Sequence, residues 1–388
     1  MATAVIVDAV RTAGGKRNGK LKDWHPVDLA AEVLQAIAGR SNLDPALVDD
    51  VIMGCVMQVG EQAVNVGRNA VLAAGWPESV PSTTVDRQCG SSQQAAHFAA
   101  QGVMAGAYDI VIAAGVESMT RVPMWANAPE PAEAYGPRFR DRYGLAAGDF
   151  INQGISGEMI AERFALTRED LDAFALSSHR RAAAATDEGR FAQEILPIRA
   201  EREDRVWTAT ADEGIRPGTT LEALAGLRAV YQEDGRLTAG TSSQLSDGAA
   251  AMLIVSEAAA TRLGLSPRAR FHSFALAGVD PIEGLSGPIP STRKVLERAG
   301  LALEDIDLFE VSEAFASVPL AWARDLGADL ERVNVNGGAI ALGHPLGCSG
   351  ARLMTTLVHE MGRRGARYGL QTMCEGGGMA NATILELA

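Results

Sequence analysis

Residues 88–115 read QCGSSQQAAHFAAQGVMAGAYDIVIAAG, and this stretch decides the fold. A turn with a glycine over 88–92 leads into a helical pattern of small residues over 93–106, and a buried apolar strand follows over 109–115. The order recurs later in the chain, with a glycine-rich turn over 337–350, a helix over 351–362 and a strand over 368–374. This repetition predicts an α/β protein built from two similar halves.

The wider chain divides in agreement with that repeat. The segment LDPALVDDVI that begins at Leu43 resembles LALEDIDLFE, which begins at Leu301. A seam after the helical stretch 257–263 predicts an N-terminal half over 1–265 and a C-terminal half over 266–388. Residues of about 118–247 are rich in Met, Trp, Pro and Arg, which predicts a mostly helical domain inserted into the first half.

Length, composition and charge exclude several classes of protein. The chain has 388 residues and 35 − 48 = −13 formal charges, so the basic footprint of a nucleic-acid binder is missing. No apolar run approaches 18 residues, and the first ten residues have no basic region or cleavage site, so we expect neither a membrane span nor a signal peptide. Four cysteines without a C-x-x-C pair predict a reducing, cytoplasmic location.

Several familiar catalytic motifs are missing from the sequence. It has no G-x-x-x-x-G-K-[ST], no G-x-G-x-x-G, no G-x-S-x-G and no second histidine at zincin spacing after His359. Nucleotide hydrolysis, dinucleotide-dependent redox chemistry, serine hydrolysis and zinc proteolysis are therefore disfavoured.

Cys89 is the first candidate for chemistry. It lies in VDRQCGSSQQA, where a turn with Gly90 opens a helix that we expect Ser91 or Ser92 to cap. A helix N-terminus favours a thiolate, which is the nucleophilic form of cysteine. A packed, inert cysteine is the alternative.

His344 and Cys374 are the other two candidates. His344 lies in GGAIALGHPLGCSG, where glycines let a ligand approach and Pro345 fixes the backbone, so the imidazole suits proton transfer. A structural or surface histidine is the alternative, and a metal site with Cys348 lacks further ligands nearby. Cys374 ends a strand beside the turn EGGGM, where we expect it to be exposed to whatever binds at the sheet edge, because the repeat places Cys89 and Cys374 beside corresponding turns; without the repeat, a core cysteine is the favoured interpretation.

The sequence resembles the thiolase family at these motifs. The matches are the Cys89 motif, GVESMT from Gly115, AGTSSQLSDGAA from Ala239, EAFA from Glu313, the block 334–350 and CEGGG from Cys374. They occur in the family's order and span 5–387, and the closest likeness is to degradative thiolases of actinobacteria. The resemblance implies a five-layered αβαβα fold of two similar halves with an inserted coenzyme A-binding loop domain, assembled as a homodimer or homotetramer.

The resemblance also implies an activity and a set of site residues. Cys89 would attack a 3-ketoacyl-CoA and carry the acyl group as a thioester, with His344 as general base and Cys374 as general acid and base. The backbone N–H groups of Cys89 and Gly376 would form one oxyanion hole, and His344 with a water would form another. Coenzyme A would be a co-substrate near Ser243 and Arg216, with no metal, while Cys55 and Cys348 would be dispensable.

Two positions depart from the family's pattern. Ser312 stands where most thiolases have an asparagine that fixes the oxyanion-hole water, and a hydroxyl reaches less far. Asn152-Gln153 stands where short-chain acetoacetyl-CoA thiolases usually have His-Met. We expect an active enzyme with an altered rate or substrate range, and neutral drift would explain both positions equally well.

Three other readings stay open at this point. A biosynthetic thiolase would condense two acetyl-CoA molecules by the same chemistry. A decarboxylating ketoacyl synthase would share the fold, but the Cys374 position argues against it. A non-catalytic CoA-ester-binding subunit would follow if Ser312 abolished activity. The acyl specificity and the physiological direction of the reaction do not follow from the sequence.

Overall fold

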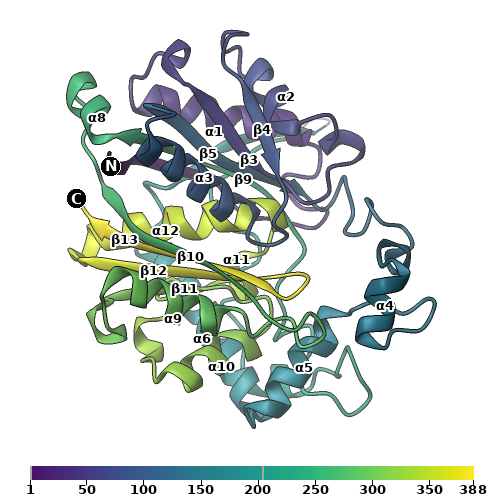
Figure 1. The fold of residues 1–388 in the computed structure, drawn as a ribbon. Coiled ribbons are helices and arrows are strands. Elements are labelled where there is room, and N and C mark those ends of the chain that lie inside the picture. The colour runs from purple at the N-terminus through teal and green to yellow at the C-terminus, as the bar shows by residue number, and fades with distance from the viewer. Residues whose placement is uncertain (1, 203–204) are drawn as a thin grey trace.

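The computed structural model describes residues 2–202 and 205–388, so Met1 lies outside it. Figure 1 shows helices and strands in alternating layers: α1 with α2, the strands β3, β4, β5 and β9, the middle helices α3 and α12, the strands β10 to β13, and α9 with α10. Separate apolar cores fill the spaces between these layers. The expected five-layered α/β architecture is confirmed.

Eleven strands in the described part of the chain form one continuous mixed sheet, whose main path runs β11-β12-β13-β10-β1-β9-β5-β3-β4. The two halves meet where β1 pairs with β10 through Val5–Arg270 and Ile6–Ala269. The strands are β1 (Ala4–Thr12), β2 (Gly15–Lys16), β3 (Asp50–Gly54), β4 (Ser82–Val85), β5 (Ile110–Ser118), β6 (Ile195–Leu196), β9 (Ser246–Ser256), β10 (Ala269–Gly278), β11 (Leu308–Val311), β12 (Tyr368–Glu375) and β13 (Met379–Leu387).

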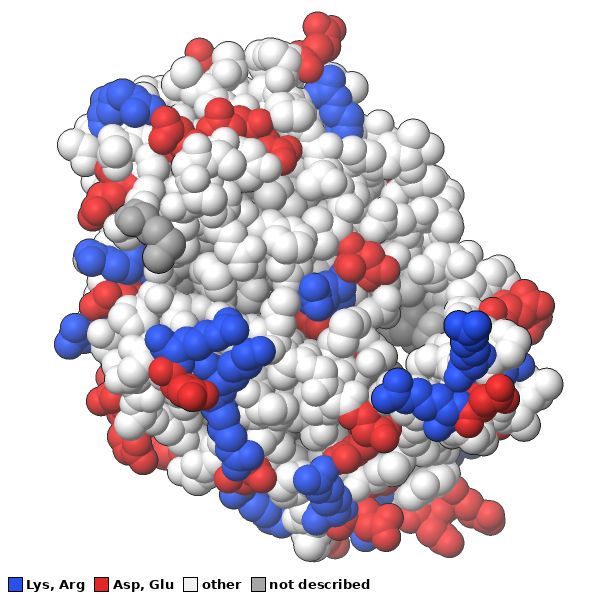
Figure 2. Space-filling model, in the orientation of Figure 1, with Lys and Arg blue, Asp and Glu red and all other residues white. Residues whose placement is uncertain are grey.

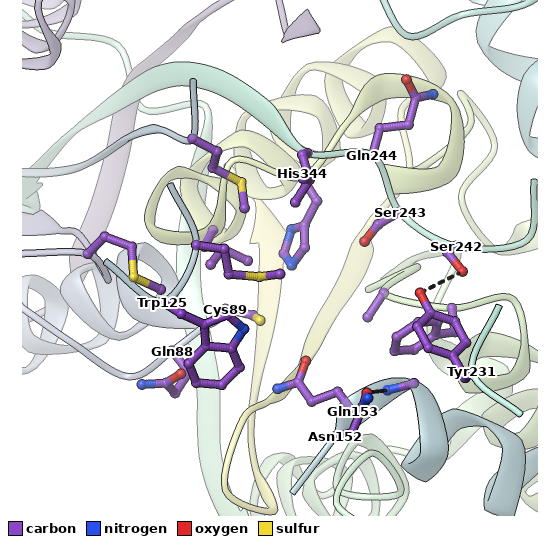
Figure 3. A pocket seen from close by; sticks show the side chains of 18 of the residues that line it. Gln88, Cys89, Trp125, Asn152, Gln153, Tyr231, Ser242, Ser243, Gln244 and His344 are labelled. Atoms are coloured by element: carbon purple, nitrogen blue, oxygen red, sulfur yellow. Dashed lines mark hydrogen bonds between the residues drawn. The ribbon is translucent and has the colours of Figure 1, made fainter. Parts of the chain in front are cut away.

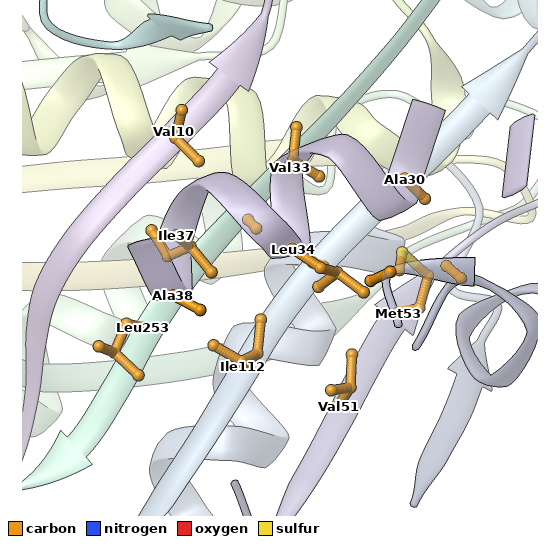
Figure 4. Packing of buried hydrophobic residues seen from close by; sticks show 14 of the residues in the cluster. Val10, Ala30, Val33, Leu34, Ile37, Ala38, Val51, Met53, Ile112 and Leu253 are labelled. Carbon is orange, nitrogen blue, oxygen red and sulfur yellow. The ribbon is translucent and has the colours of Figure 1, made fainter. Parts of the chain in front are cut away.

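Helix α1 shows how the sequence pattern builds an outer layer. Buried residues recur along it at helical spacing and form one apolar stripe that lies on the sheet (Figure 4): Leu29, Ala30, Val33, Leu34, Ile37 and Ala38. The other helices of the layers are α2 (Val66–Ala73), α3 (Ser91–Ala105), α8 (Glu257–Leu263), α9 (Pro288–Ala299), α10 (Ser317–Leu326), α11 (Ala339–Leu342) and α12 (Ser349–Arg364); α1 spans Pro26–Arg40.

The middle layer positions the site, because its two helices meet near their N-termini. Gly350 packs directly on the backbone of Gln93, where a Cβ atom would have no room. The Ala351 N–H also donates to Ser92 Oγ at 2.8 Å. The turns that precede α3 and α12 are therefore neighbours, although more than 200 residues separate them in the sequence.

The segment between β5 and β9 forms the insertion. It holds the expected helices, α4 (Pro137–Tyr143), α5 (Gln153–Arg163), α6 (Arg168–Asp187) and α7 (Leu221–Ala225), and also the hairpin of β7 (Ile198–Arg202) with β8 (Arg205–Ala209). Among the described residues, no helix combines the length and the apolar character needed to cross a membrane.

Candidate active site

Cys89 lies in a tight turn just before α3. Gln88 adopts a left-handed backbone conformation with φ 49°, and the helix begins at Ser91 after Gly90. The expected cap by Ser91 or Ser92 is wrong. The Ser91 hydroxyl bonds back into the turn, accepting from Arg87 N–H and donating to the Gln88 carbonyl, and Ser92 Oγ accepts from α12. These serines hold the turn and the helix contact, and no side chain caps α3.

Burial disfavours the thiolate form of Cys89. Cys89 is only 6% exposed, and burial raises the pKa of its thiol far above the usual range, helped by Cys374 and Glu375. The backbone N–H groups of Cys89 and Gly376 oppose this rise. The expectation that the helix N-terminus yields a ready thiolate is therefore wrong, because desolvation outweighs the local dipoles. A nucleophilic Cys89 requires a base.

His344 presents one ring nitrogen that is free to act as that base. Its backbone N–H donates to the Gln244 carbonyl at 3.0 Å, which fixes the loop. Its Nδ1 lies 2.6 Å from Ser349 Oγ, and Ser349 Oγ donates to the Pro345 carbonyl at 2.8 Å. A hydroxyl has one proton to donate, so Ser349 accepts the Nδ1–H of His344. Nε2 is then the unprotonated nitrogen, and it is buried without a partner.

The His344 ring is uncharged. Burial lowers its pKa to about 3, and the positive charge of Arg352 adds to the effect. A neutral imidazole with a free lone pair can accept a proton, whereas an imidazolium cannot. Figure 3 shows the His344 ring and the Cys89 side chain directed into the same cavity.

That cavity has a volume of about 410 Å³. It lies between the turn of Cys89, the loop of His344 and the inserted segment. Its wall is mostly apolar, with a few polar groups, as is usual for a site that binds a small molecule. The residues that line it are Met57, Gln88, Cys89, Met119, Met124, Trp125, Phe150, Asn152, Gln153, Gly154, Tyr231, Ser242, Ser243, Gln244, Leu245, Ala314, Phe315, His344 and Leu346.

Glu117 holds the loop of His344 against the first half. This fully buried carboxylate on β5 accepts hydrogen bonds from the backbone N–H groups of Gly347 at 2.8 Å, Val56 at 2.9 Å and Met57 at 3.1 Å. Three backbone donors with fixed positions leave the loop little freedom. Glu117 therefore couples the strand of one half to the loop of the other.

Cys374 lies near enough to Cys89 to affect the pKa of its thiol, but it does not line the cavity. It sits within β12 and is fully buried, so the expected exposure at the strand end is wrong: β12 runs one residue further, and Cys374 belongs to an apolar cluster to which α5 and α10 contribute. Burial raises the pKa of its thiol to about 12, and the nearby hydroxyl of Ser312 opposes the rise. Ser312 Oγ is buried and makes no hydrogen bond of ordinary geometry.

Gly376 lines a second cavity of about 300 Å³, which shares Gln88, Trp125 and Gln153 with the first. Glu375 lies beside it, fully buried, and neither of its carboxylate oxygens has a hydrogen-bonding partner. Burial raises the pKa of Glu375 to about 8, with Arg87 opposing the rise and Asp86 adding to it. The carboxyl group is therefore largely neutral at pH 7.

The two residues expected near coenzyme A differ in their surroundings. Ser243 lines the first cavity, where its backbone N–H donates to the Ala314 carbonyl. Arg216 is exposed, lies outside that lining, and donates its backbone N–H to His179 Nδ1 at 3.2 Å. In the described part of the chain, no group of three or more His, Cys, Asp or Glu side chains could hold a metal.

Two residues of this site were not found from the sequence. Ser349 follows His344 by five positions in the same glycine-rich loop, and that spacing is the only signal for its contact. Glu375 belongs to the CEGGG motif, but its burial follows from the close approach of Gly90, whose missing side chain leaves room for the carboxyl group. Neither contact follows from local periodicity.

The fold and the site together define a class of protein: two fused α/β halves with a cysteine–histidine site between their middle helices. Comparison with known proteins agrees with this description. The family model of the thiolase N-terminal domain matches residues 4–258, and the family model of the thiolase C-terminal domain matches residues 265–387. The chain belongs to the thiolase family.

Individual relatives match over the full length of the chain. A protein of Mycobacterium tuberculosis named steroid 3-ketoacyl-CoA thiolase FadA6 is 49% identical over 100% of this chain and 94% of its own. A 3-ketoacyl-CoA thiolase of Aliivibrio fischeri is 46% identical over all of both chains. The crystal structure of the Bacillus anthracis acetyl-CoA acetyltransferase superimposes with a TM-score of 0.92 at 39% identity, covering 100% of this chain and 99% of that one.

Proposed function

We propose that the protein is a degradative thiolase that uses coenzyme A to cleave 3-ketoacyl-CoA into acetyl-CoA and a shortened acyl-CoA. The observation that carries the proposal is the arrangement of three groups: the buried Cys89 thiol, the free Nε2 of His344 in the same cavity, and the buried Cys374 thiol, which lies near enough to Cys89 to raise the pKa of its thiol. The names of the full-length relatives support the same reaction.

The first half-reaction would form the acyl-enzyme. His344 Nε2 takes the Cys89 proton as the sulfur attacks the 3-keto carbon, and the N–H groups of Cys89 and Gly376 stabilise charge beside the sulfur. The bond between C2 and C3 then breaks. The electron pair stays on C2 of the departing fragment, Cys374 gives that carbon its proton, and acetyl-CoA leaves while the acyl group remains on Cys89.

The second half-reaction would return both cysteines to their starting state. The Cys374 thiolate takes the thiol proton of an incoming coenzyme A, and the resulting CoA thiolate attacks the acyl group on Cys89. The Cys89 thiolate leaves and recovers its proton from His344. Ser312 stands beside Cys374 and would hold the oxyanion-hole water that His344 shares.

Coenzyme A would be held by Ser243 and Arg216 of the inserted domain, at about 118–247, within the N-terminal half 1–265; residues 266–388 would form the C-terminal half. Figure 2 shows Lys and Arg side chains gathered into patches on one face of this acidic protein, and such patches suit a phosphorylated ligand. We further propose a homodimer or homotetramer in the cytoplasm, with no metal.

The deciding experiment is a thiolysis assay. Purified protein is mixed with coenzyme A and acetoacetyl-CoA or a longer 3-ketoacyl-CoA, and loss of the enolate absorbance gives the rate. We expect cleavage that Cys89→Ala abolishes and that the matched variant Cys55→Ala retains, since Cys55 lines neither cavity.

Absence of cleavage by a folded wild-type protein that binds coenzyme A would overturn the proposal. Restoration of activity by Ser312→Asn in that case would favour the non-catalytic CoA-ester-binding protein. Faster condensation of acetyl-CoA than thiolysis at equal saturation would instead favour the biosynthetic direction, which uses the same groups.

A further inference from the structure

The loop of His344 begins where the short helix α11 stops. The last helical bond runs from the Gly343 N–H to the Ala339 carbonyl. The next N–H in line, that of His344, would pair with the Ile340 carbonyl in a continuing α-helix. It donates instead to the Gln244 carbonyl at 3.0 Å. Gly343, with φ 92°, allows this change of direction, which turns His344 out of the helix.

The side chain of Gln244 takes the place of the missing helical partner. Its Nε2 donates to the Ile340 carbonyl at 2.7 Å and to the Gly214 carbonyl at 2.9 Å. Both neighbours are acceptors, and only the amide nitrogen of a glutamine side chain carries protons, so no other orientation makes both bonds. Gln244 therefore holds both ends of the bond that α11 does not make, Ile340 with its side chain and His344 with its backbone. Figure 3 shows the Gln244 side chain directed away from Cys89.

Gly214 belongs to a segment that lies directly against the loop of His344. A Cβ atom at Gly214 would be 2.5 Å from the Ala341 carbonyl oxygen and 3.0 Å from the amide nitrogen and oxygen of Gln244. The two backbones are therefore in contact, and one amide group spans them. This contact leaves the loop of His344 little room to move toward the segment of Gly214 or away from it.

The segment 212–216 is itself anchored on both sides of Gly214. Asp212 is buried and accepts two hydrogen bonds from the guanidinium of Arg11, at 2.7 and 3.1 Å. The backbone N–H of Arg216 donates to Nδ1 of the buried His179 at 3.2 Å. The glutamine amide thus connects the loop of the histidine to a fixed segment of the inserted domain.

We propose that Gln244 is a positioning residue for His344, whose amide fixes the loop so that the imidazole keeps its place in the cavity of Cys89. The inference rests on the proposed thiolase activity, because it assigns Gln244 a part in proton transfer from Cys89 to His344. A displacement of about 1 Å at a reacting group can cost about a hundredfold in rate. Loss of the two amide bonds should therefore lower the rate of the chemical steps more than it weakens substrate binding.

The first test is Gln244→Leu, which keeps most of the side-chain volume and removes both donors. We expect kcat for thiolysis of acetoacetyl-CoA to fall about 10- to 100-fold while KM stays within about threefold. Alkylation of Cys89 by iodoacetamide, measured by mass spectrometry, should also slow about tenfold, because the sulfur loses its base. Gln35→Leu is the matched control: its amide donates to the Ala74 carbonyl at 3.1 Å in the outer helical layer and lines neither cavity, so both rates should stay within about twofold.

A second variant perturbs the same contact from the other side. Gly214→Ala leaves Gln244 unchanged but places a methyl group where the Ala341 carbonyl leaves no room, so the segment and the loop must separate. We expect kcat to fall here as well. Gly218→Ala is its matched control, because a Cβ atom at Gly218 meets nothing within 4 Å.

Gln244→Glu distinguishes positioning from a general loss of structure. An ionised carboxylate cannot donate to either carbonyl, whereas a protonated carboxyl group can donate to one of them. The activity of this variant relative to wild type should therefore recover as the pH is lowered from about 8 to about 6, and Gln244→Leu should show no such recovery.

Three results would overturn the inference: a Gln244→Leu enzyme within threefold of wild type in kcat, equal rates for Gly214→Ala and Gly218→Ala, or the same pH profile for the Glu and Leu variants. Failure of the thiolase proposal looks different. The wild type would then show no Cys89-dependent cleavage of any 3-ketoacyl-CoA, while the alkylation rate of Cys89 would still report on the contact between Gln244 and the loop of His344.

Discussion

Ser349→Ala removes the group that sets the protonation pattern of His344. In the wild type, Ser349 Oγ accepts a hydrogen bond from the His344 Nδ1–H at 2.6 Å and donates one to the Pro345 carbonyl. The Nε2 lone pair of His344 is then free in the cavity. The variant leaves the ring in place without this acceptor. Moving the proton to Nε2 then becomes favourable, and a ring in that form cannot take a proton from Cys89.

The size of the effect follows from the burial of the pair. Both residues are buried, and a buried donor without an acceptor costs about 1–3 kcal/mol. In the variant, the hydrogen-bond free energy that favours the Nδ1–H tautomer of His344 is lost. Each loss of about 1.4 kcal/mol lowers the rate about tenfold. We expect kcat and kcat/KM for thiolysis to fall about 10- to 100-fold with little change in KM, because Ser349 does not line the substrate cavity.

The assay combines steady-state thiolysis with acylation of Cys89 followed by mass spectrometry and with nitrogen NMR of the His344 ring. Thr355→Val is the matched control: Thr355 is also fully buried on α12, but its hydroxyl donates to the Ala351 carbonyl at 2.8 Å, whereas His344 Nδ1 is paired with Ser349. The reasoning would be refuted by a Ser349→Ala enzyme within threefold of wild type, or by an equal loss in the control.

Three further predictions test other parts of the site. Cys374→Ala should still acylate Cys89 but lose about 10²–10⁴ in turnover, since the departing carbanion lacks its acid; turnover within tenfold of wild type would contradict this. Wild-type kcat/KM should decline as pH rises above about 8, because ionised Glu375 raises the pKa of both thiols, and Glu375→Gln should lack that decline when the two pH profiles are compared. Burial lowers the pKa of His97 to about 3, so the unfolded state binds its proton first as pH falls below 6.5. Urea unfolding measures the free energy of unfolding of wild type and of His97→Gln. The difference between them should fall by about 2 kcal/mol from pH 7 to pH 5, and an unchanged difference would show that His97 does not have a lowered pKa in the folded state.

The sequence predicts the layers of this fold well because they depend on local patterns. The buried stripe of α1 and the apolar runs of β5 and β12 have the periods of a helix and of buried strands. The repeat located the two turns before α3 and α12, and Cys89 and His344 lie in those turns and line one cavity. A histidine among glycines in a short loop predicts a proton-transfer site from the sequence alone.

The errors concern electrostatics and long-range contacts. Helix position suggested a lowered pKa for Cys89, but the pKa depends mainly on how much protein covers the sulfur, and that follows from the packing of both halves. Ser92 was expected to cap its own helix and instead bonds to α12, which is 259 residues away. Such contacts depend on which helices and strands pack together in the fold, and a local sequence pattern does not specify that packing.

The contact between the N-termini of α3 and α12 has a consequence for how such a site can arise. The two turns occupy corresponding places in the repeat, yet one supplies the nucleophile and the other supplies the base. Two identical subunits with this geometry would carry the same side chain at both places and could not divide the roles. Joining the copies in one chain allows each turn to change separately, so the asymmetry of the reaction is a property of the fusion itself.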